Sequence, residues 1–300
     1  MNEAAVLDVT RLQVLLAVAR HGSVTAAAAA LNYAQPSVSH HLARLEAETG
    51  ARLVQRAGRG IRLTEAGRLL ADRAEEIIGR LDAAESELDA VTGMRAGRVR
   101  LAAFPSALGT FAATAVAEFR VAHPGVEVSL SEAEPPEAIA ALRAGEVELA
   151  LAFSHEPADL PAGIRAVPLL DEPLYLVTAP DRTGTELADF ADTPWIAGCA
   201  RCRGHLLACC ADAGFTPTIA FTTDDYVAVQ SLVAAGVAVS TLPGLAITAA
   251  RNASVRITRI PGAGRHVVAL TYGEAPDPPA TEALLAALRI ATTALPRWPE

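Results

Sequence analysis

Residues 22–50 read GSVTAAAAALNYAQPSVSHHLARLEAETG, and this stretch decides the N-terminal fold. Ser23 is suited to begin a helix over residues 24–31, because its hydroxyl can accept a free backbone N–H. After a short turn, Pro36 fits the first turn of a second helix, where its missing N–H is not needed. Gly50 then ends that helix. Its inward-facing residues follow helical spacing: Val38, Leu42 and Leu45.

A helix over residues 9–20 comes before this pair, and a strand–turn–strand wing follows it at LVQRAGRGIRLTEAG. In a helix-turn-helix, the second helix enters the DNA major groove with its N-terminal residues toward the base edges. Glutamine can pair with adenine, serine and histidine can donate to bases, and arginine suits phosphate. The candidate DNA contacts are Thr25, Gln35, Pro36, Ser37, Ser39, His40, Arg44, Arg56 and Arg59. The alternative is a three-helix protein-binding module with a solvated polar face.

The charge of the chain is unevenly distributed. The 300 residues carry a net charge of −9, which alone argues against nucleic acid. Residues 1–64, however, carry seven arginines and four acidic residues, while the remainder carries 18 arginines and 30 acidic residues. A basic end on an acidic body is expected when only that end meets phosphate.

A long helix is predicted from Glu65 to Thr92, with Thr64 as its N-cap and Gly93 as its stop. Apolar residues recur along it at alternating spacings of four and three, which indicates a heptad seam that pairs with a partner chain. The alternative is a helix packed on its own domain. The seam residues are Leu70, Ala74, Ile77, Leu81, Ala84, Leu88 and Val91.

Beyond this helix the pattern changes to alternating strands and helices, which predicts an α/β domain with a parallel sheet. We expect domains at 1–64, 65–93 and 98–300, the last with one lobe at 98–165 and 264–300 and a second at 166–263. Two lobes joined by two crossing segments form a cleft, the usual place for a small ligand. The longest charge-free run, residues 226–250, reads as helix, strand, turn and helix in a core, and not as a membrane span.

The stretch GCARCRGHLLACC crowds five soft ligands into one short segment: Cys199, Cys202, His205, Cys209 and Cys210. Such a cluster could bind zinc or copper(I), react as thiols, or serve a structural role at the rim of the cleft. A cysteine hydrolase using Cys202 and His205 is disfavoured, because no nucleophile elbow accompanies them. We therefore expect no enzyme.

The N-terminus shows no secretory signal, so we expect a cytoplasmic protein without membrane contact. A solute-binding protein with a fused N-terminal domain is the alternative. The missing signal and the basic residues 1–64 argue against it.

Residues 9–67 closely resemble the N-terminal domain of LysR-type transcriptional regulators, in LLAVARHGSVTAAAAALNYAQPSVSHHLARLEAETGARLVQR and GRGIRLTEAG. The resemblance continues through GEVELALAF, DEPLYLVTAPD and AGFTPTIAFTTDDYVAVQSLVAAGVAVSTLPGLAI. It implies a winged helix-turn-helix, a dimerising linker helix and a two-lobed effector domain of periplasmic-binding-protein type. It also implies binding to double-stranded promoter DNA as a homodimer or a tetramer built from two dimers, RNA polymerase as a further partner, and a small-molecule co-inducer in place of a required cofactor.

The same resemblance places DNA contacts at Gln35, Pro36, Ser39, His40, Arg56 and Arg59. Many members carry Arg or Gln where His40 and His41 stand, and a histidine reaches less far and is mostly neutral. We expect His40 to face the groove, and His41 to lie beside the DNA backbone or pack against the wing. The alternative for His41 is a buried, purely structural role.

The effector positions that the resemblance implies begin where the first strand of the domain meets its helix. A helix start favours an anion, so a carboxylate co-inducer is one expectation, and a plain N-cap role for Ser106 is the other. The implied positions are Ser106, Ala107, Phe153, Gly198, Cys202, Thr222 and Pro243. Peroxide-sensing LysR-type proteins carry a cysteine pair in this part of the second lobe. The spacing here differs, so that Cys210 aligns with their second cysteine and Arg201 falls near their first. A thiol- or metal-responsive regulator is therefore a variant within the same class.

Overall fold

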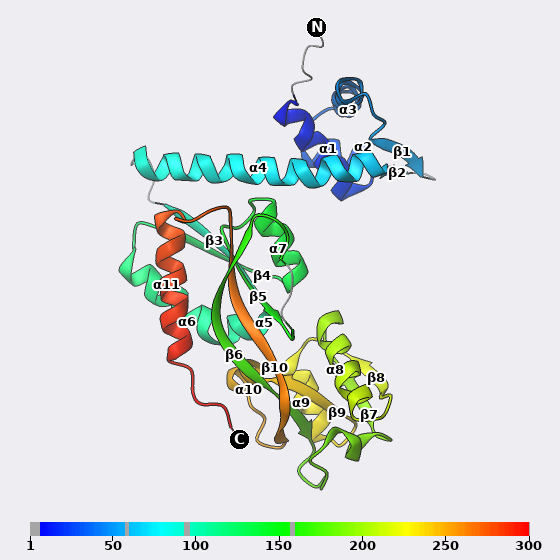
Figure 1. Ribbon diagram of the computed structural model, residues 1–300, viewed down its shortest axis with the longest axis vertical. Coiled ribbons are helices and arrows are strands. Elements are labelled where there is room, and N and C mark those ends of the chain that lie inside the picture. Colours follow the sequence, from blue (N-terminus) through cyan, green and yellow to red (C-terminus); the bar gives the residue numbers. More distant parts are fainter. Residues whose placement is uncertain (1–6, 58–59, 93–96, 157–159, 300) are drawn as a thin grey trace. The chain divides into compact units, whose positions relative to one another are not determined.

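The computed structural model describes residues 7–57, 60–92, 97–156 and 160–299 (Figure 1). The described chain forms two compact units. The first comprises residues 7–92 with 140–146, and the second comprises residues 97–139 with 147–299. We describe each unit by itself.

Three short helices open the first unit: α1 (Val9–His21), α2 (Val24–Ala30) and α3 (Gln35–Thr49). The predicted cap is confirmed, because Ser23 Oγ accepts the Ala26 N–H at 3.4 Å. Gly22 and Gly50 end α1 and α3 at φ of 62° and 66°, a conformation that glycine adopts without steric cost. Val38, Leu42 and Leu45 are buried against α1 and α2, as their spacing predicted.

The wing consists of β1 (Val54–Ala57) and β2 (Gly60–Leu63), which pair antiparallel. Glu46 joins it to α3, since one carboxylate oxygen accepts the Leu53 N–H at 2.8 Å and the Val54 N–H at 3.3 Å. The long helix α4 (Glu65–Thr92) then begins at its predicted cap, where Thr64 Oγ1 accepts the Gly67 N–H at 3.0 Å. The predicted stop, Gly93, lies outside the described residues.

The predicted seam of α4 divides into two parts. Leu70 and Ala74 pack into the core of their own unit, because α4 lies against α1 there. Ile77, Leu81 and Leu88 are exposed, at 38%, 43% and 62% of their surface. Ala84 is exposed too, and the side chain of Val91 lies outside the described part of the chain. The heptad spacing thus runs through two parts of α4 that differ in burial: a start packed in the core and an exposed continuation.

The second unit is built on one mixed sheet with the strand order β4-β3-β5-β10-β6-β9-β7-β8. β3 (Arg98–Ala103), β4 (Glu127–Glu132) and β5 (Leu149–Ser154) run parallel in the first lobe, as predicted. β7 (Pro194–Ala197), β8 (Thr218–Thr222) and β9 (Val239–Pro243) run parallel in the second. The long antiparallel strands β6 (Ile164–Thr178) and β10 (Arg256–Tyr272) pass through both lobes (Figure 1). β7 was not predicted, because its four residues show no alternation.

Helices cover the strands of each lobe. The first lobe carries α5 (Pro105–Ala107), a π-helical turn at Leu108–Ala112, α6 (Ala113–Ala122), the start of α7 (Pro135–Arg143) and α11 (Pro279–Thr293). The second carries a 3-10 turn at Leu187–Phe190, α8 (Ala200–Asp212), α9 (Tyr226–Ala234) and α10 (Gly244–Ala249). The charge-free run therefore folds as helix, strand and helix, as predicted.

No single described helix is long and apolar enough to cross a membrane. The pair α1 and α2 reaches that threshold only when joined, across a bend of 118°. Its apolar residues form the core of the first unit.

Candidate functional site

The outer face of α3 presents polar side chains. All of the predicted α3 contacts are exposed: Gln35, Pro36, Ser37, Ser39, His40 and Arg44. They lie opposite three side chains that are at most 4% exposed, so packing holds this helix by one face and leaves the other for a ligand. Gln35 Nε2 lies 3.5 Å from Ser39 Oγ, which sets the two polar groups side by side at the start of the helix.

The neighbouring predicted contacts lie on other elements. Thr25 is exposed in the first turn of α2, and Arg56 is exposed on β1 of the wing. Arg59 lies outside the described residues. His41 is half-buried and stacks on Tyr33, with ring centroids 6.0 Å apart, so it packs on the turn before α3.

Several arginines of the basic end are already paired. Arg44 Nε lies 3.2 Å from Glu48, which also pairs with Arg11. Exposed pairs of this kind contribute only about 0–1 kcal/mol, so a phosphate can replace Glu48 as the partner of Arg44. Within the described residues Arg56 makes no ion pair.

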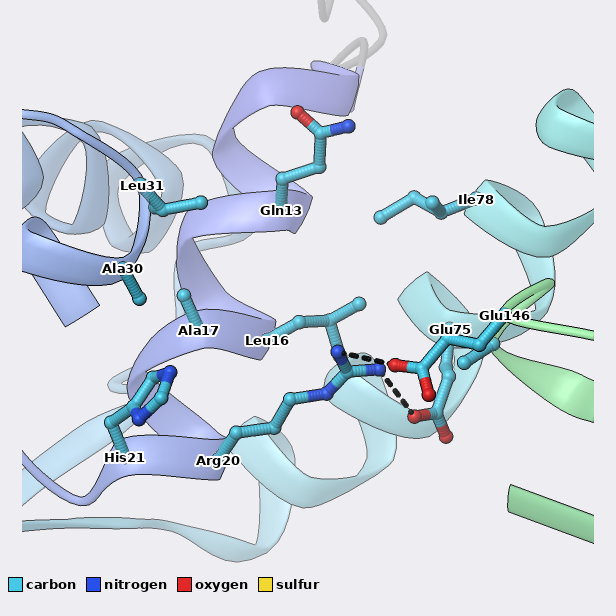
Figure 2. Close-up of a pocket in the computed structure, with 11 residues that line it drawn as sticks. Gln13, Leu16, Ala17, Arg20, His21, Ala30, Leu31, Glu75, Ile78 and Glu146 are labelled. Carbon is cyan, nitrogen blue, oxygen red and sulfur yellow. Dashed lines mark hydrogen bonds and ion pairs between the residues drawn. The ribbon is translucent and has the colours of Figure 1, made fainter. Parts of the chain in front are cut away.

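A hollow of about 420 Å³ lies beside α1 and α4 in the first unit (Figure 2). Figure 2 shows the Arg20 guanidinium turned toward two carboxylates: Glu75 at 3.4 Å and Glu146 at 2.8 Å. Arg20 is thereby neutralised locally. The net charge of residues 1–64 therefore overstates the positive charge that this unit offers to phosphate.

In the second unit, a buried ion pair lies where β10 and β6 meet the start of α5. The Arg265 guanidinium is 1% exposed and lies 2.5 and 2.8 Å from one Glu172 oxygen. It also donates to Ser106 Oγ at 3.0 Å. Within the described part of the chain, Arg265 Nη1 has no hydrogen-bond partner. A buried donor without a partner is costly, so this N–H is available to donate a hydrogen bond to an acceptor on a bound ligand.

The second unit also contains two cavities. The larger, of about 590 Å³, is mostly apolar and is lined by Phe153 and Leu170, with Arg201 and His266 among its polar groups. The smaller, of about 30 Å³, holds about one water-sized molecule. Its lining includes three predicted effector positions, Gly198, Cys202 and Pro243, and Cys199, which was predicted as a thiol or metal ligand. It also includes groups that were not predicted: Glu134, Thr223, Asp224 and Tyr226.

The predicted effector positions therefore divide. Ser106 and Ala107 are buried at the start of α5, and Phe153 lines the larger cavity at 3% exposure. Thr222 is exposed at the end of β8, and its neighbour Thr223 lines the small cavity instead. Arg265, Glu172 and Glu134 were missed, since single charged residues in apolar strands or loops carry no motif.

Two histidines from opposite lobes stack across the cleft. The rings of His155, after β5, and His205, on α8, have centroids 3.8 Å apart and planes within 6°. Burial, followed by the nearby His205, lowers the pKa of His155 to about 4. Burial also lowers the pKa of His205. Both rings are therefore neutral at pH 7, and the stack is an uncharged contact between the lobes.

The five soft ligands do not converge on one point. Cys199 and Cys202 form one pair, with Sγ atoms 3.1 Å apart, and His205 Nε2 lies 3.3 Å from Cys209 Sγ in a second. Cys210 is fully buried in the lobe core. Among the described residues, no group of three or more histidine, cysteine or acidic side chains could hold a metal ion. The contacts of His205 with Cys209 and His155, and of the Cys202 sulfur with Cys199, thus separate the soft ligands into distinct pairs.

Comparison with known proteins decides the family. A model of the LysR substrate binding domain matches residues 92–292, and a model of bacterial regulatory helix-turn-helix proteins of the lysR family matches residues 9–68. The chain belongs to the LysR family. The resemblance of residues 9–67 and of the effector blocks is thereby confirmed.

Relatives with curated names agree with this membership. LrrA of Synechococcus elongatus, a probable HTH-type transcriptional regulator, is 35% identical over 48% of this LysR-family chain and 49% of its own length. The matched part thus spans about half the length of that relative. TcbR of a Pseudomonas species, an HTH-type transcriptional regulator, is 26% identical over 91% of this chain and 95% of its own.

Solved structures support the fold of this LysR-family chain. CbnR, a LysR family transcriptional regulator, superposes with a TM-score of 0.63 at 24% identity, covering 95% of this chain and 99% of its own. A variant of full-length OxyR from Pseudomonas aeruginosa gives 0.68 at 18% identity over 98% and 99%. CbnR was also solved in complex with its target DNA. Sequence identities of 24% and 18% show that the fold is shared and nothing further.

Proposed function

We propose that this LysR-family chain is a sequence-specific DNA-binding transcriptional regulator in the cytoplasm and has no enzymatic activity. The observation that carries the proposal is the one-sided burial of α3, which leaves its polar face exposed. Gln35 and His40 would read base edges in the major groove, while Arg44, Arg56 and Arg59 with Thr25 would contact phosphates. Pro36, Ser37 and Ser39 complete the face.

The oligomer follows from α4. Ile77, Leu81, Ala84 and Leu88 form an exposed apolar stripe that a second copy of the chain would cover. The domains would then be 1–64, 65–93 and 98–300, in a homodimer or a homotetramer. Such an assembly binds half-sites about one helical turn apart, or a multiple of it, and RNA polymerase is a further partner.

The second unit would bind a small-molecule co-inducer between its lobes, and no cofactor is required. Support comes from the mostly apolar cavity of about 590 Å³, which Arg201 and His266 also line. Separately, Arg265 Nη1 is a buried donor with no partner among the described residues, and the Arg265 guanidinium lies over the Phe153 ring that lines this cavity. An apolar ligand with an anionic or carbonyl acceptor fits this combination. The ligand can act only by binding more tightly to one arrangement of the lobes than to another.

The test is footprinting of the full-length protein on the DNA upstream of its own gene, at two salt concentrations. We expect protection over several helical turns that weakens steeply with salt. Gln35→Ala should weaken binding by about 1–3 kcal/mol at one base position, whereas Gln13→Ala, on the exposed side of α1, should not.

Arg56→Ala should lower the salt slope by about 0.9 per site, since it removes one phosphate contact. Its control, Arg289→Ala on α11, removes the same charge from the second unit. Equal effects of the two arginine variants would contradict the proposed DNA surface. Failure to bind any DNA at low salt would contradict the function itself.

A further inference from the structure

The first turn of α8 holds two cysteines that the proposed DNA and effector contacts leave chemically unused. Cys199 is the N-cap of α8 and Cys202 lies three residues later, with their sulfurs 3.1 Å apart. We propose that Cys199 and Cys202 form a reversible disulfide by exchange with low-molecular-weight disulfides. This modification site lies in the effector cleft. The proposal deepens the proposed function, because it places thiol chemistry beside the co-inducer site.

The helix explains why the two sulfurs meet. An N-cap side chain folds back over the first turn, and Cys199 Sγ accepts the Cys202 N–H at 3.4 Å. The side chain of Cys202 therefore points at the same sulfur. A disulfide needs about 2.05 Å between sulfurs, so side-chain rotation within one turn closes the remaining gap. Cys209 and Cys210 lie about two turns along α8, roughly 10 Å from Cys202, and cannot replace either partner.

The two thiols are unequal, as an exchange reaction requires. A hydrogen bond with the Cys202 thiol lowers the pKa of Cys199 to about 6, although its partial burial opposes this. The same hydrogen bond, followed by burial, raises the pKa of Cys202. Cys199 is thus a partly exposed thiolate at neutral pH, and Cys202 is a partly exposed, protonated thiol. Low-pKa thiols at helix N-termini and in Cys-x-x-Cys motifs are the reactive ones.

A carboxyl group completes the site. Glu134 lines the same small cavity as Cys199 and Cys202, and its Oε2 is buried with no partner among the described residues. Burial, and then the Cys199 sulfur, raise the pKa of Glu134 to about 7. The Glu134 carboxyl therefore exchanges a proton near neutral pH. When Cys199 is consumed, its negative charge disappears, and Glu134 ionises and can accept a proton from Cys202.

The reaction proceeds in two steps. The Cys199 thiolate attacks one sulfur of a disulfide RSSR, whose S–S bond breaks, and the leaving RS⁻ takes a proton from water. Cys202 then passes its proton to the Glu134 carboxylate and attacks Cys199 Sγ, which breaks the mixed disulfide and releases a second RS⁻. Two electrons pass from the cysteine pair to RSSR, which becomes two thiols. Excess small thiol reverses both steps.

The experiment treats the reduced full-length protein with oxidised glutathione and maps its four cysteines by mass spectrometry. We expect a disulfide between Cys199 and Cys202, with Cys209 and Cys210 still free. Cys202→Ser should stop at a glutathione adduct on Cys199. Cys199→Ser should give no adduct on Cys202. Cys209→Ser is the matched control on the same helix and should react like the parent.

Glu134→Gln separates a proton-accepting role from a structural one. We expect the adduct on Cys199 to form at the parental rate but to resolve at least tenfold more slowly, because a general base contributes about a hundredfold or more. A merely structural residue would not slow one step alone.

Three results would overturn the proposal: equal reaction of Cys209, reaction of Cys202 in Cys199→Ser, or oxidation by hydrogen peroxide with none by oxidised glutathione. DNA binding by the reduced parent protein and by the Cys199→Ser and Cys202→Ser variants keeps the two hypotheses apart. If the reduced parent protein binds DNA normally but forms no disulfide with oxidised glutathione, only the disulfide is rejected. A reduced parent protein that binds no DNA rejects the regulator.

Discussion

Removing the negative charge of Glu172 should destabilise the second unit strongly. Both partners of its ion pair are buried, with side-chain exposures of 1% for Arg265 and 0% for Glu172. Arg265 Cζ also lies 4.1 Å from the centroid of the Phe153 ring, so little water reaches the guanidinium. Breaking a buried pair from one side costs about 3–5 kcal/mol, because it leaves an uncompensated charge in the interior. We expect Glu172→Gln to lower the free energy of unfolding by that amount.

The choice of glutamine isolates the charge. Glu172 Oε2 accepts the Leu245 N–H at 2.7 Å at the start of α10, and a glutamine oxygen can keep that bond. The second variant combines Glu172→Gln with Arg265→Met. It removes the stranded guanidinium, so we expect it to be more stable than Glu172→Gln alone. A buried pair replaced on both sides is often close to neutral.

The assay is urea unfolding of the full-length protein followed by tryptophan fluorescence. Trp195 and Trp298 are the two tryptophans of the chain, and both lie in the second unit, so the signal reports that unit. The dependence of the unfolding free energy on urea should stay unchanged, since the surface exposed on unfolding is the same. A loss below about 1 kcal/mol for Glu172→Gln, or a double variant less stable than the single one, would refute the reasoning.

Three further outcomes are expected. Gly67→Ala should destabilise the first unit by roughly 2 kcal/mol or more, measured by thermal unfolding with circular dichroism, because its Cβ would lie 2.0 Å from the Leu53 carbonyl oxygen. Gly204→Ala on α8, with nothing within 4 Å of the added Cβ, should instead stabilise the second unit by about 0.5–1 kcal/mol; an equal loss in both would contradict the steric argument. The unfolded His155 takes up a proton near pH 6.5 and the native one only near 4, so its contribution to stability should fall as the pH drops between these values, and urea titrations of His155→Gln should show a flatter pH dependence than the parent.

The pH dependence has an opposing contribution that the variants can separate. The native Glu134 pKa of about 7 lies above its ordinary 4.5, so this group stabilises the fold at low pH and loses that effect as the pH rises from 4.5 to 7. Glu134→Gln should therefore remove a contribution that stabilises the fold at low pH and declines as the pH rises. His155→Gln should remove a contribution that destabilises the fold at low pH. If both substitutions changed the pH dependence of the unfolding free energy in the same direction, the burial of one of the two groups would be contradicted.

Local signals in the sequence determined the elements of the first unit. Ser23, Gly50 and Thr64 act on the turn in which they stand, and their predicted roles as cap or stop are observed. The apolar spacing of α3 likewise determined which face is buried, and hence that Gln35 and His40 face outward. These features depend on hydrogen bonds and contacts within about four residues, so the order of residues along the chain contains them.

Tertiary structure decided the features that join distant residues. Arg265 and Glu172 meet across two strands 93 positions apart, and no local pattern pairs them. Packing against α1 buried the start of the α4 stripe and left the rest exposed, although the spacing is the same throughout. The surroundings of the cysteines depend on both local sequence and tertiary structure. The N-cap geometry of α8 brings Cys199 to Cys202, which the Cys-x-x-Cys spacing suggested, but only the fold brings Glu134 to that pair, because it comes from the other lobe.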